Sequence, residues 1–282
     1  MTQWLDGRAI AAAVLGEVAE RVDALQARLG RAPSLAVVQV GADPSSAWYV
    51  RQIERTGRRV GIDVRVQALE ATCAADAPAR LVAQLCADPT VHGVIVQQPL
   101  PSHTPLAGVL AALDPRKDVD GLHPYNAGLL AQGRTEGLAP ATPLGGVELL
   151  RRAGLPIVGQ HAVVVGRSAV VGRPLALLLL AEHATVTVCH TRTRDLGAIT
   201  RQADILAVAA GRPGLITAEM VRPGAVVLDF GANDVGGQMT GDVAPGVADV
   251  AGWLTPVPGG TGPMTNAMLS RNLVAAAEQQ LA

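Results

Sequence analysis

The sequence contains almost no lysine: among its 23 lysine and arginine residues, Lys117 is the only lysine. The net charge is −1 at pH 7, so charge gives no reason to expect nucleic acid or a membrane surface as a partner. No apolar run reaches the length that spans a bilayer, and the first residues lack a signal-peptide pattern. These absences predict a cytoplasmic protein.

Cysteine is also scarce, with three residues at positions 73, 86 and 189. Their number is odd, and they lie too far apart for the paired spacing of a zinc site or a redox motif. We therefore expect structural thiols and no metal site.

The pattern of the remaining residues predicts an α/β fold. The chain has 282 residues, enough for two domains, and 49% of them are hydrophobic. Expected strands at 35–40, 64–69 and 93–97 alternate with expected helices, and strands at 163–165, 185–189, 205–209 and 225–230 continue the alternation after a bridging helix at 142–153. Such alternation predicts parallel sheets with helices on both faces.

The clearest local motif is a strand, a glycine turn and a helix at 163–180. Three valines form the strand, Gly166 permits a sharp turn, and Pro174 suits the first turn of the helix. The N-terminus of such a helix favours a phosphate group. Gly166 and Gly172 are spaced G-x5-G rather than G-x-G-x-x-G, so the pattern alone leaves an ordinary βα turn open.

Other unusual segments lie where ligands of parallel sheets bind, beyond the carboxyl ends of strands. They are the loop Gln97-Gln98-Pro99-Leu100-Pro101, the segment Lys117-Asp118-Val119-Asp120-Gly121 within a polar stretch at 114–142, and the glycine- and proline-rich stretch 255–265.

Together with Tyr49-Val50 in the second expected helix, these motifs resemble the methylenetetrahydrofolate dehydrogenase/cyclohydrolase family of one-carbon metabolism over nearly the whole chain. The resemblance implies a catalytic, folate-binding domain at 1–141, completed by the C-terminal helix 264–282. It also implies a Rossmann-type NADP-binding domain at 142–263, a folate cleft between the two domains, and a homodimer joined through the cofactor domains.

The resemblance also assigns the folate site. Asp120 holds the pterin, because a carboxylate accepts paired hydrogen bonds from an aminopyrimidinone edge. Tyr49 meets the aminobenzoyl part, and the backbone at Pro258, Gly259 and Gly260 lets the substrate pass close by. Gln97 joins Tyr49 and Asp120 as a catalytic residue. A loop-capping aspartate remains the alternative for Asp120.

For the cofactor we expect NADP. An NAD-selective site usually has an acidic residue at the end of the second strand, whereas this strand ends in Cys189-His190-Thr191-Arg192. Hydroxyl and guanidinium groups favour a 2′-phosphate, although Arg192 and Arg194 as solvated surface charges remain an alternative. The expected cofactor-binding residues are Gly166, Arg167, Ser168, Gly172, Arg173, Thr191, Arg192, Gly231 and Ala232.

One departure from the family is chemical. The family pattern Tyr-Val-x-x-Lys becomes Tyr49-Val50-Arg51-Gln52-Ile53, so Ile53 stands where the family has a lysine that moves protons during hydrolysis of the methenyl group. The lysine's usual partner remains as Gln97. Isoleucine has no titratable atom and cannot relay a proton.

Three hypotheses remain open at this point. The first is a dehydrogenase with weak or absent cyclohydrolase activity, the second a bifunctional enzyme with another proton carrier, and the third a non-catalytic binding protein. Shikimate dehydrogenase, which the stretch at 191–193 resembles slightly, needs a lysine–aspartate pair that the first domain does not supply convincingly.

Overall fold

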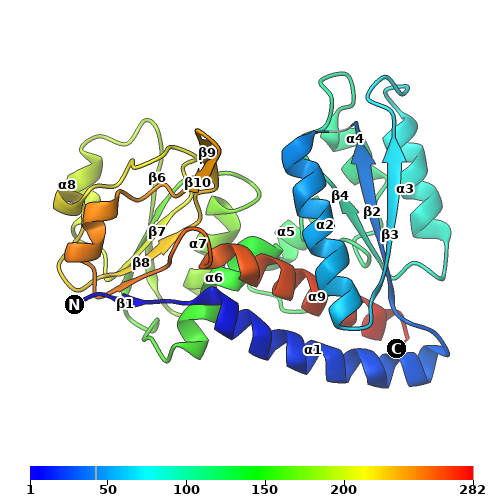
Figure 1. Ribbon diagram of the computed structural model, residues 1–282, viewed down its shortest axis with the longest axis horizontal. Coiled ribbons are helices and arrows are strands. Elements are labelled where there is room, and N and C mark those ends of the chain that lie inside the picture. The colour runs from blue at the N-terminus through cyan, green and yellow to red at the C-terminus, as the bar shows by residue number, and fades with distance from the viewer. Residues whose placement is uncertain (42, 282) are drawn as a thin grey trace. The chain divides into compact units, whose positions relative to one another are not determined.

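The computed structural model describes residues 1–41 and 43–281 and divides into two compact units. Unit 1 comprises residues 1–12 and 142–265, and unit 2 comprises residues 13–141 and those from 266 onward. The helices α1 (Gly7–Leu29) and α9 (Thr261–Gln280) contribute to both units (Figure 1). Within the described residues, no helix is both long and apolar enough to cross a membrane.

Unit 1 is built on a six-stranded parallel sheet with the order β1-β11-β8-β7-β5-β6. Its strands are β1 (Gln3–Trp4), β5 (His161–Val165), β6 (Thr185–Cys189), β7 (Ile205–Val208), β8 (Val226–Asp229) and β11 (Trp253–Leu254). The other elements are α6 (Ala141–Arg152), α7 (Gly172–Ala181), α8 (Leu196–Thr200), the short 3-10 helices η1 (Ala218–Met220) and η2 (Pro245–Asp249), and the hairpin β9 (Asn233–Val235) and β10 (Gln238–Thr240).

Both faces of this sheet are buried. On β5, Ala162 and Val164 belong to one hydrophobic cluster, whereas Val163 and Val165 belong to another. Successive side chains of a strand point to opposite faces, so the two clusters lie on opposite sides of the sheet. This arrangement confirms the predicted α/β class with helices on both faces.

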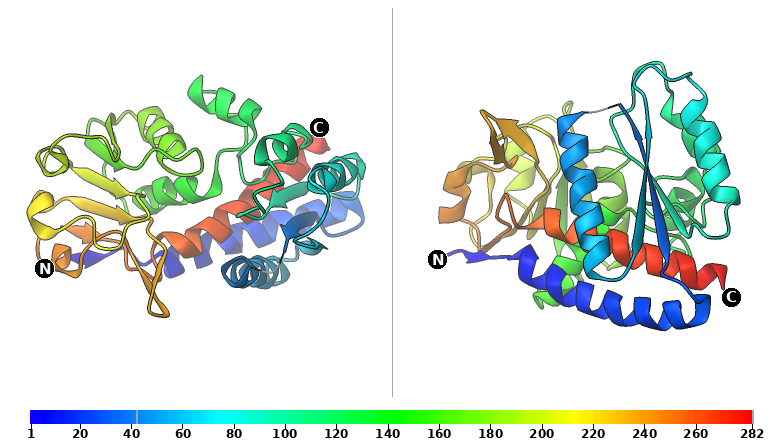
Figure 2. Two further views of the ribbon diagram at one scale, coloured as in Figure 1. Left: turned by 90° about the horizontal axis from the view of Figure 1, so that it is seen from above. Right: turned by 45° about the vertical axis from the view of Figure 1, so that its right-hand side comes forward.

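Unit 2 contains a smaller parallel sheet with the order β3-β2-β4. Right-handed crossovers in this order require α2 and α3 on opposite faces, which the right view of Figure 2 shows. The elements are β2 (Ser34–Val40), α2 (Pro44–Arg59), β3 (Asp63–Leu69), α3 (Ala77–Ala87), β4 (Gly93–Val96), α4 (Leu106–Ala111) and α5 (Pro124–Ala131).

The chain passes from unit 2 to unit 1 between residues 141 and 142, and the predicted bounds of the two functional domains stay a prediction. Residues 1–12, expected in the catalytic domain, group with unit 1, because β1 pairs with β11 there. Residues 264 and 265, expected to begin the C-terminal helix of the catalytic domain, also group with unit 1. The assignment of a function to each domain stays a prediction.

Candidate functional site

In unit 2 the site begins at the N-terminus of α2. Asp43 caps this helix, its carboxylate accepting a hydrogen bond from the Ser46 N–H at 2.9 Å. The Ser46 hydroxyl donates to the carbonyl of Gln98 at 3.2 Å, which ties α2 to the loop after β4. Tyr49 and Ile53 follow on the helix four residues apart, so they share one face.

The second part of the site is the segment 117–121, which runs beside β4. The Val94 N–H donates to the Lys117 carbonyl at 2.7 Å, and Val94 also forms a parallel bridge with Asp118. Asn272 of α9, buried in unit 2, donates to the carbonyls of Val119 and Ala139, both at 2.9 Å. These bonds fix the backbone on both sides of Asp120.

The glycine that follows Asp120 shows how tightly the chain is packed here. Gly121 has a φ of +68°, and a Cβ on it would overlap the backbone of Pro140. Only glycine fits this position, so the fold fixes the backbone conformation next to Asp120.

Two neighbouring carboxylates of this segment differ in their surroundings. Asp118 accepts hydrogen bonds from the Leu122 N–H at 3.1 Å, the His123 N–H at 2.8 Å and the Asn126 amide at 2.9 Å. Burial raises the pKa of the Asp118 carboxyl, and these hydrogen bonds oppose that rise in part. For Asp120, burial and the negative charge of Asp118 raise the pKa to about 7. Asp120 therefore takes up a proton near neutral pH.

Tyr49 and Asp120 interact electrostatically. Burial is the main cause that raises the pKa of the Tyr49 phenol, and the charge of Asp120 raises it further. The phenol stays protonated across the physiological range, so it can serve as a hydrogen-bond donor. The structure thus brings together Tyr49 and Asp120, two residues that the sequence analysis placed in one site.

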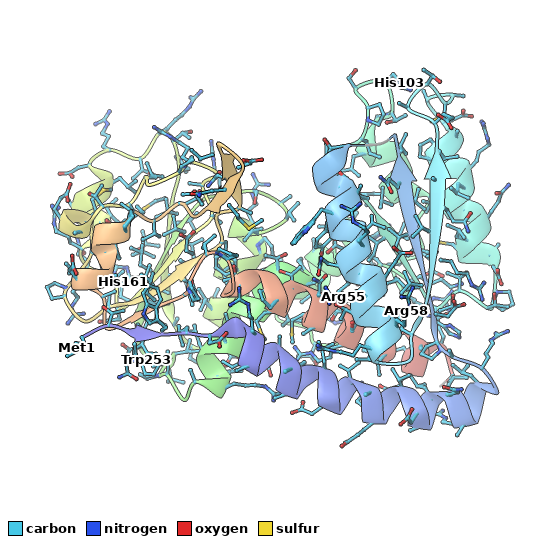
Figure 3. The ribbon with its side chains drawn as sticks, viewed as in Figure 1. Met1, Arg55, Arg58, His103, His161 and Trp253 are labelled. Carbon is cyan, nitrogen blue, oxygen red and sulfur yellow. The ribbon has the colours of Figure 1, made fainter. Side chains whose placement is uncertain are left out.

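Gln97 and Ile53 complete the predicted catalytic set in unit 2. Gln97 directly follows β4, where its N–H donates to the carbonyl of Val38 at 2.9 Å and its side-chain amide donates to the carbonyl of Gln98 at 2.8 Å. Ile53 is buried, with 3% of its surface exposed. Arg55 and Arg58, labelled in Figure 3, extend from the later turns of the same helix and are exposed.

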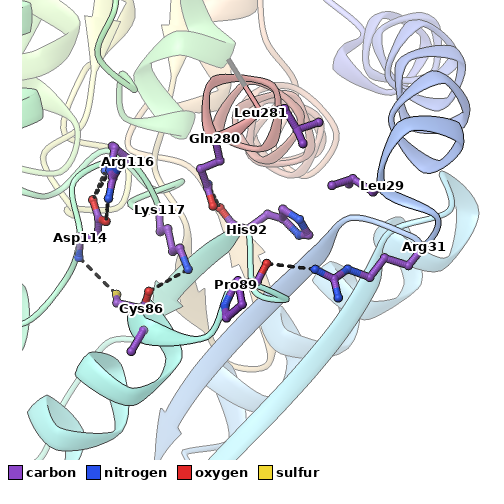
Figure 4. A pocket seen from close by; sticks show the side chains of 11 residues that line it. Leu29, Arg31, Cys86, Pro89, His92, Asp114, Arg116, Lys117, Gln280 and Leu281 are labelled. Atoms are coloured by element: carbon purple, nitrogen blue, oxygen red, sulfur yellow. Dashed lines mark hydrogen bonds and ion pairs between the residues drawn. The ribbon is translucent and has the colours of Figure 1, made fainter.

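The single lysine of the chain is engaged elsewhere in unit 2. Lys117 is buried, and its ammonium donates to the carbonyls of Cys86 and Asp88, both at 2.8 Å, at the end of α3 (Figure 4). It lines a pocket of about 410 Å³ together with Pro89 and His92, which precede β4. This pocket lies at the amino end of the strand, whereas Gln97 lies beyond its carboxyl end.

In unit 1 the predicted phosphate loop is formed as a tight turn. Gly166 has a φ of +134°, and a Cβ on it would overlap the carbonyl of Ala209. A Cβ on Gly172 would in turn overlap the carbonyl of Gly166. Ser168 accepts hydrogen bonds on its hydroxyl from the N–H groups of Val171 and Gly172, at 3.1 and 3.3 Å. The turn after β5 therefore packs directly on the loop after β7.

The other predicted cofactor residues lie at the same edge of this sheet. After β6, the His190 N–H donates to the Thr193 hydroxyl at 2.8 Å and the Arg192 N–H to the His190 ring at 3.1 Å. Thr191 and Arg192 are exposed, as are Arg167, Ser168 and Arg173. After β8 come the buried Gly231 and the exposed Ala232. The close backbone approach at two glycines, the helix N-terminus and the exposed arginines fit a phosphorylated dinucleotide.

The predicted substrate loop at 258–260 also belongs to unit 1. Gly259 has a φ of +119°, and a Cβ on Gly260 would overlap Thr255 and the carbonyl of Pro256. Gly259 and Gly260 are buried and Pro258 is exposed. The structure therefore places the predicted folate residues on both units, with Tyr49, Gln97 and Asp120 on one and the loop 258–260 on the other.

Sequence reasoning missed two buried carboxylates in unit 1, Asp229 and Asp242, which are 3% and 0% exposed. Asp229 ends a hydrophobic strand, and this was the available signal, because an acidic residue at a strand's carboxyl end faces the ligand edge of a parallel sheet. Asp242 carries no such signal, since it lies in an irregular segment after β10.

Comparison with known proteins gives matches along nearly the whole chain. Residues 140–281 match the NAD(P)-binding domain of the tetrahydrofolate dehydrogenase/cyclohydrolase family, and residues 5–120 match its catalytic domain. A relative from Chloroflexus aurantiacus, named bifunctional protein FolD, is 56% identical over 280 residues, which cover 98% of each chain.

Two solved structures are closely similar. The bifunctional methylenetetrahydrofolate dehydrogenase/cyclohydrolase of Campylobacter jejuni has a TM-score of 0.96 and 40% identity over 99% of each chain. The enzyme of Trypanosoma brucei, solved with NADP and an inhibitor, has a TM-score of 0.94 and 37% identity over 99% of this chain and 98% of that one.

Proposed function

The chain belongs to the tetrahydrofolate dehydrogenase/cyclohydrolase family, and on this basis we propose that it oxidises 5,10-methylenetetrahydrofolate to 5,10-methenyltetrahydrofolate with NADP. The observation that carries the proposal is that Tyr49 on α2 interacts electrostatically with Asp120 on the rigid segment 117–121, in a chain of this family. A carboxylate and a phenol together offer an acceptor for the pterin edge and a flat donor surface for the aminobenzoyl group.

For this reaction the protein mainly has to position the substrate and the cofactor and stabilise the charge that develops. The substrate carbon lies between two nitrogens, whose lone pairs stabilise the methenyl cation as the hydride leaves. NADP, which the residues after β5, β6 and β8 would hold, would supply the acceptor for that hydride. In its ionised form, Asp120 accepts hydrogen bonds from the pterin, while the Tyr49 phenol orients the aminobenzoyl group. Neither role requires a proton carrier at position 53.

We expect NADP rather than NAD, because hydroxyl and guanidinium groups follow β6 and no acidic residue stands among residues 189–194. Thr191 and Arg192 are exposed there and free to meet a 2′-phosphate, as is Arg173 on the first turn of α7.

Hydrolysis of the methenyl group is different, since water must lose protons and a ring nitrogen must gain one. By the resemblance, position 53 is where the family has its lysine, and here it is a buried isoleucine. Lys117 does not replace it, because its ammonium is bound to two carbonyls at the end of α3. We therefore propose that cyclohydrolase activity is weak or absent, lower by about 10²–10⁴-fold than with a positioned acid–base group.

A second candidate, the fully bifunctional enzyme, is favoured by one observation. Asp120 titrates near pH 7, where a general acid or base works best. If hydrolysis persists in this protein, Asp120 is the proton carrier that the structure favours over Tyr49, whose phenol holds its proton too tightly.

We also propose a homodimer joined through the cofactor domains. In the described part of the chain, β6 is a terminal strand of its sheet. Val188 on this edge strand is 41% exposed, and Leu180 at the end of α7, a helix that contacts β6, is 58% exposed. A cytoplasmic location stays a prediction.

The test is a spectrophotometric assay of the purified protein. We expect reduction of NADP with methylenetetrahydrofolate, slower reduction of NAD, and slow loss of methenyltetrahydrofolate when it is supplied alone. Ile53→Lys should increase that loss at least tenfold, and Gln97→Ala in the same background should abolish the gain. Absence of any dehydrogenase activity would favour the non-catalytic binding protein, and rapid hydrolysis by the natural protein would favour the bifunctional enzyme.

A further inference from the structure

Two buried carboxylates of unit 1 accept hydrogen bonds from three separate loops. Asp229, the last residue of β8, accepts from the N–H groups of Gly231 at 2.8 Å, Asp242 at 3.0 Å and Val243 at 3.0 Å. Its carbonyl and its N–H are also engaged, with the hydroxyls of Thr261 and Thr255 respectively.

Asp242 extends the network to the loop after β7. One of its carboxylate oxygens accepts from the N–H groups of Ala210 at 2.6 Å and Gly211 at 2.8 Å. The other accepts from the Arg212 N–H at 2.8 Å and the Asn233 side-chain amide at 2.9 Å. Six of the seven donors to the two carboxylates are backbone N–H groups and the seventh is the Asn233 amide, so the loop backbone supplies most of their stabilisation.

Such an arrangement is rigid for an electrostatic reason. A buried carboxylate that loses its donors carries the full cost of its desolvation, so each N–H group is held firmly in place. The loops at 210–212, 231–233 and 242–243 are therefore fixed relative to one another by two side chains, in addition to the backbone pairing of Asn233 with Thr240 and of Ile216 with Val243.

The position of these loops in the sheet suggests what they hold. The strand order β6-β5-β7-β8 reverses direction at β5, and a dinucleotide bound to such a sheet lies across the carboxyl ends at that point. The phosphate turn after β5 and the loop after β6 take the adenosine half. The nicotinamide half then lies over the loops after β7 and β8, the two loops bound to Asp242. Gly166, packed on Ala209, joins the two halves of the site.

We propose that Asp242, supported by Asp229, is a positioning residue for the nicotinamide half of the cofactor. This rests on the proposed NADP-dependent function. Asp242 does not touch the reacting atoms in this proposal; it sets the backbone on which the nicotinamide rests. Hydride transfer is sensitive to small displacements of the ring, so loss of this support affects turnover as well as affinity.

The test compares the whole cofactor with its adenosine half. Asp242→Asn keeps the shape of the side chain but places an NH₂ group against backbone N–H donors. We expect the Kd for NADP, measured by calorimetry, to increase at least tenfold and kcat to fall at least tenfold. The Kd for adenosine 2′,5′-bisphosphate and the KM for the folate substrate should change less than twofold.

A control and a second variant keep the outcome interpretable. Asp249→Asn changes an exposed carboxylate of the same unit and should leave all four quantities unchanged. If Asp242→Asn does not fold, Asn233→Ala serves in its place, because it removes one donor to Asp242. It should raise the Kd for NADP several-fold and leave the Kd for the bisphosphate unchanged. Equal loss of both ligands, or no loss of NADP in Asn233→Ala or Asp242→Asn, overturns the proposal. Failure of the proposed function is separate, because it appears as absent dehydrogenase activity in the unmutated protein.

Discussion

Replacement of Asp120 by asparagine should stabilise the ligand-free protein at neutral and alkaline pH while weakening its binding of folate. The carboxyl has a pKa of about 7 in the folded chain, against an ordinary value of 3.8, because of burial and the neighbouring charge of Asp118. Below pH 3.8 the group is protonated in both the folded and the unfolded protein. Between pH 3.8 and 7 the folded protein holds a proton that the unfolded protein releases, so the stability falls as the pH rises through this range.

The size of the effect follows from the two pKa values. Their difference corresponds to about 4 kcal/mol of destabilisation above pH 7 as an upper bound. Asp120 is half-buried, and water reduces this figure, so we expect Asp120→Asn to stabilise the protein by about 1–4 kcal/mol at pH 8. The gain should shrink steadily as the pH falls to 4, because the penalty is absent there.

The assay is thermal or urea unfolding of the ligand-free protein at several pH values from 4 to 8.5, with Asp23→Asn on the exposed side of α1 as the control. In parallel, the Kd for tetrahydrofolate should increase at least tenfold in Asp120→Asn at pH 8, with NADP binding nearly unchanged. A stability difference that does not vary with pH would refute the raised pKa. Normal folate binding would make Asp120 a structural loop residue.

Three further variants test other parts of the fold. Gly166→Ala places a Cβ against the Ala209 carbonyl at a positive φ, so it should lower the free energy of unfolding by more than about 2 kcal/mol. Unchanged stability and unchanged NADP binding would contradict the tight turn. Asn272→Ala leaves two carbonyls without their donor, so it should lower the free energy of unfolding by about 2 kcal/mol and raise the KM for folate. The control Ser270→Ala removes a hydrogen bond within α9, and equal effects of the two variants would refute this reasoning. Arg192→Ala should reduce the preference for NADP over NAD about tenfold in kcat/KM, and an unchanged ratio would leave this arginine a surface charge.

The sequence allowed correct prediction of the elements whose signals are local. The valines of β5 form a strand buried on both faces, and the predicted turn follows at Gly166 with a φ of +134°. The two-residue strands β1 and β11 were not predicted, because each is defined by pairing with a partner distant in the sequence.

The candidate site shows the same limit. Tyr49, Gln97 and Asp120 could be found because their motifs are distinctive, but the raised pKa of Asp120 could not, since it depends on burial and on the charge of Asp118. Asp118 itself is surrounded by three hydrogen-bond donors. Within the polar stretch 114–142, α5 and the buried Asn126 supply one of those donors. Asp242 looks like an ordinary loop residue in the sequence, and its importance appears only when four donors converge on it.

The side chain at position 53 bears on the raised pKa of Asp120. Ile53 lies one helical turn after Tyr49 on the same face of α2, and the Tyr49 phenol interacts electrostatically with Asp120. An ammonium at this place would favour the ionised form of Asp120 and lower its pKa, whereas a buried isoleucine leaves burial and Asp118 unopposed. Ile53→Lys should therefore do two things at once: supply a proton carrier, and move the pH below which folate binding weakens from about 7 to a lower value. If only hydrolysis changes and the pH profile of folate binding stays in place, the two positions act independently and Asp120 owes its pKa to its own segment alone.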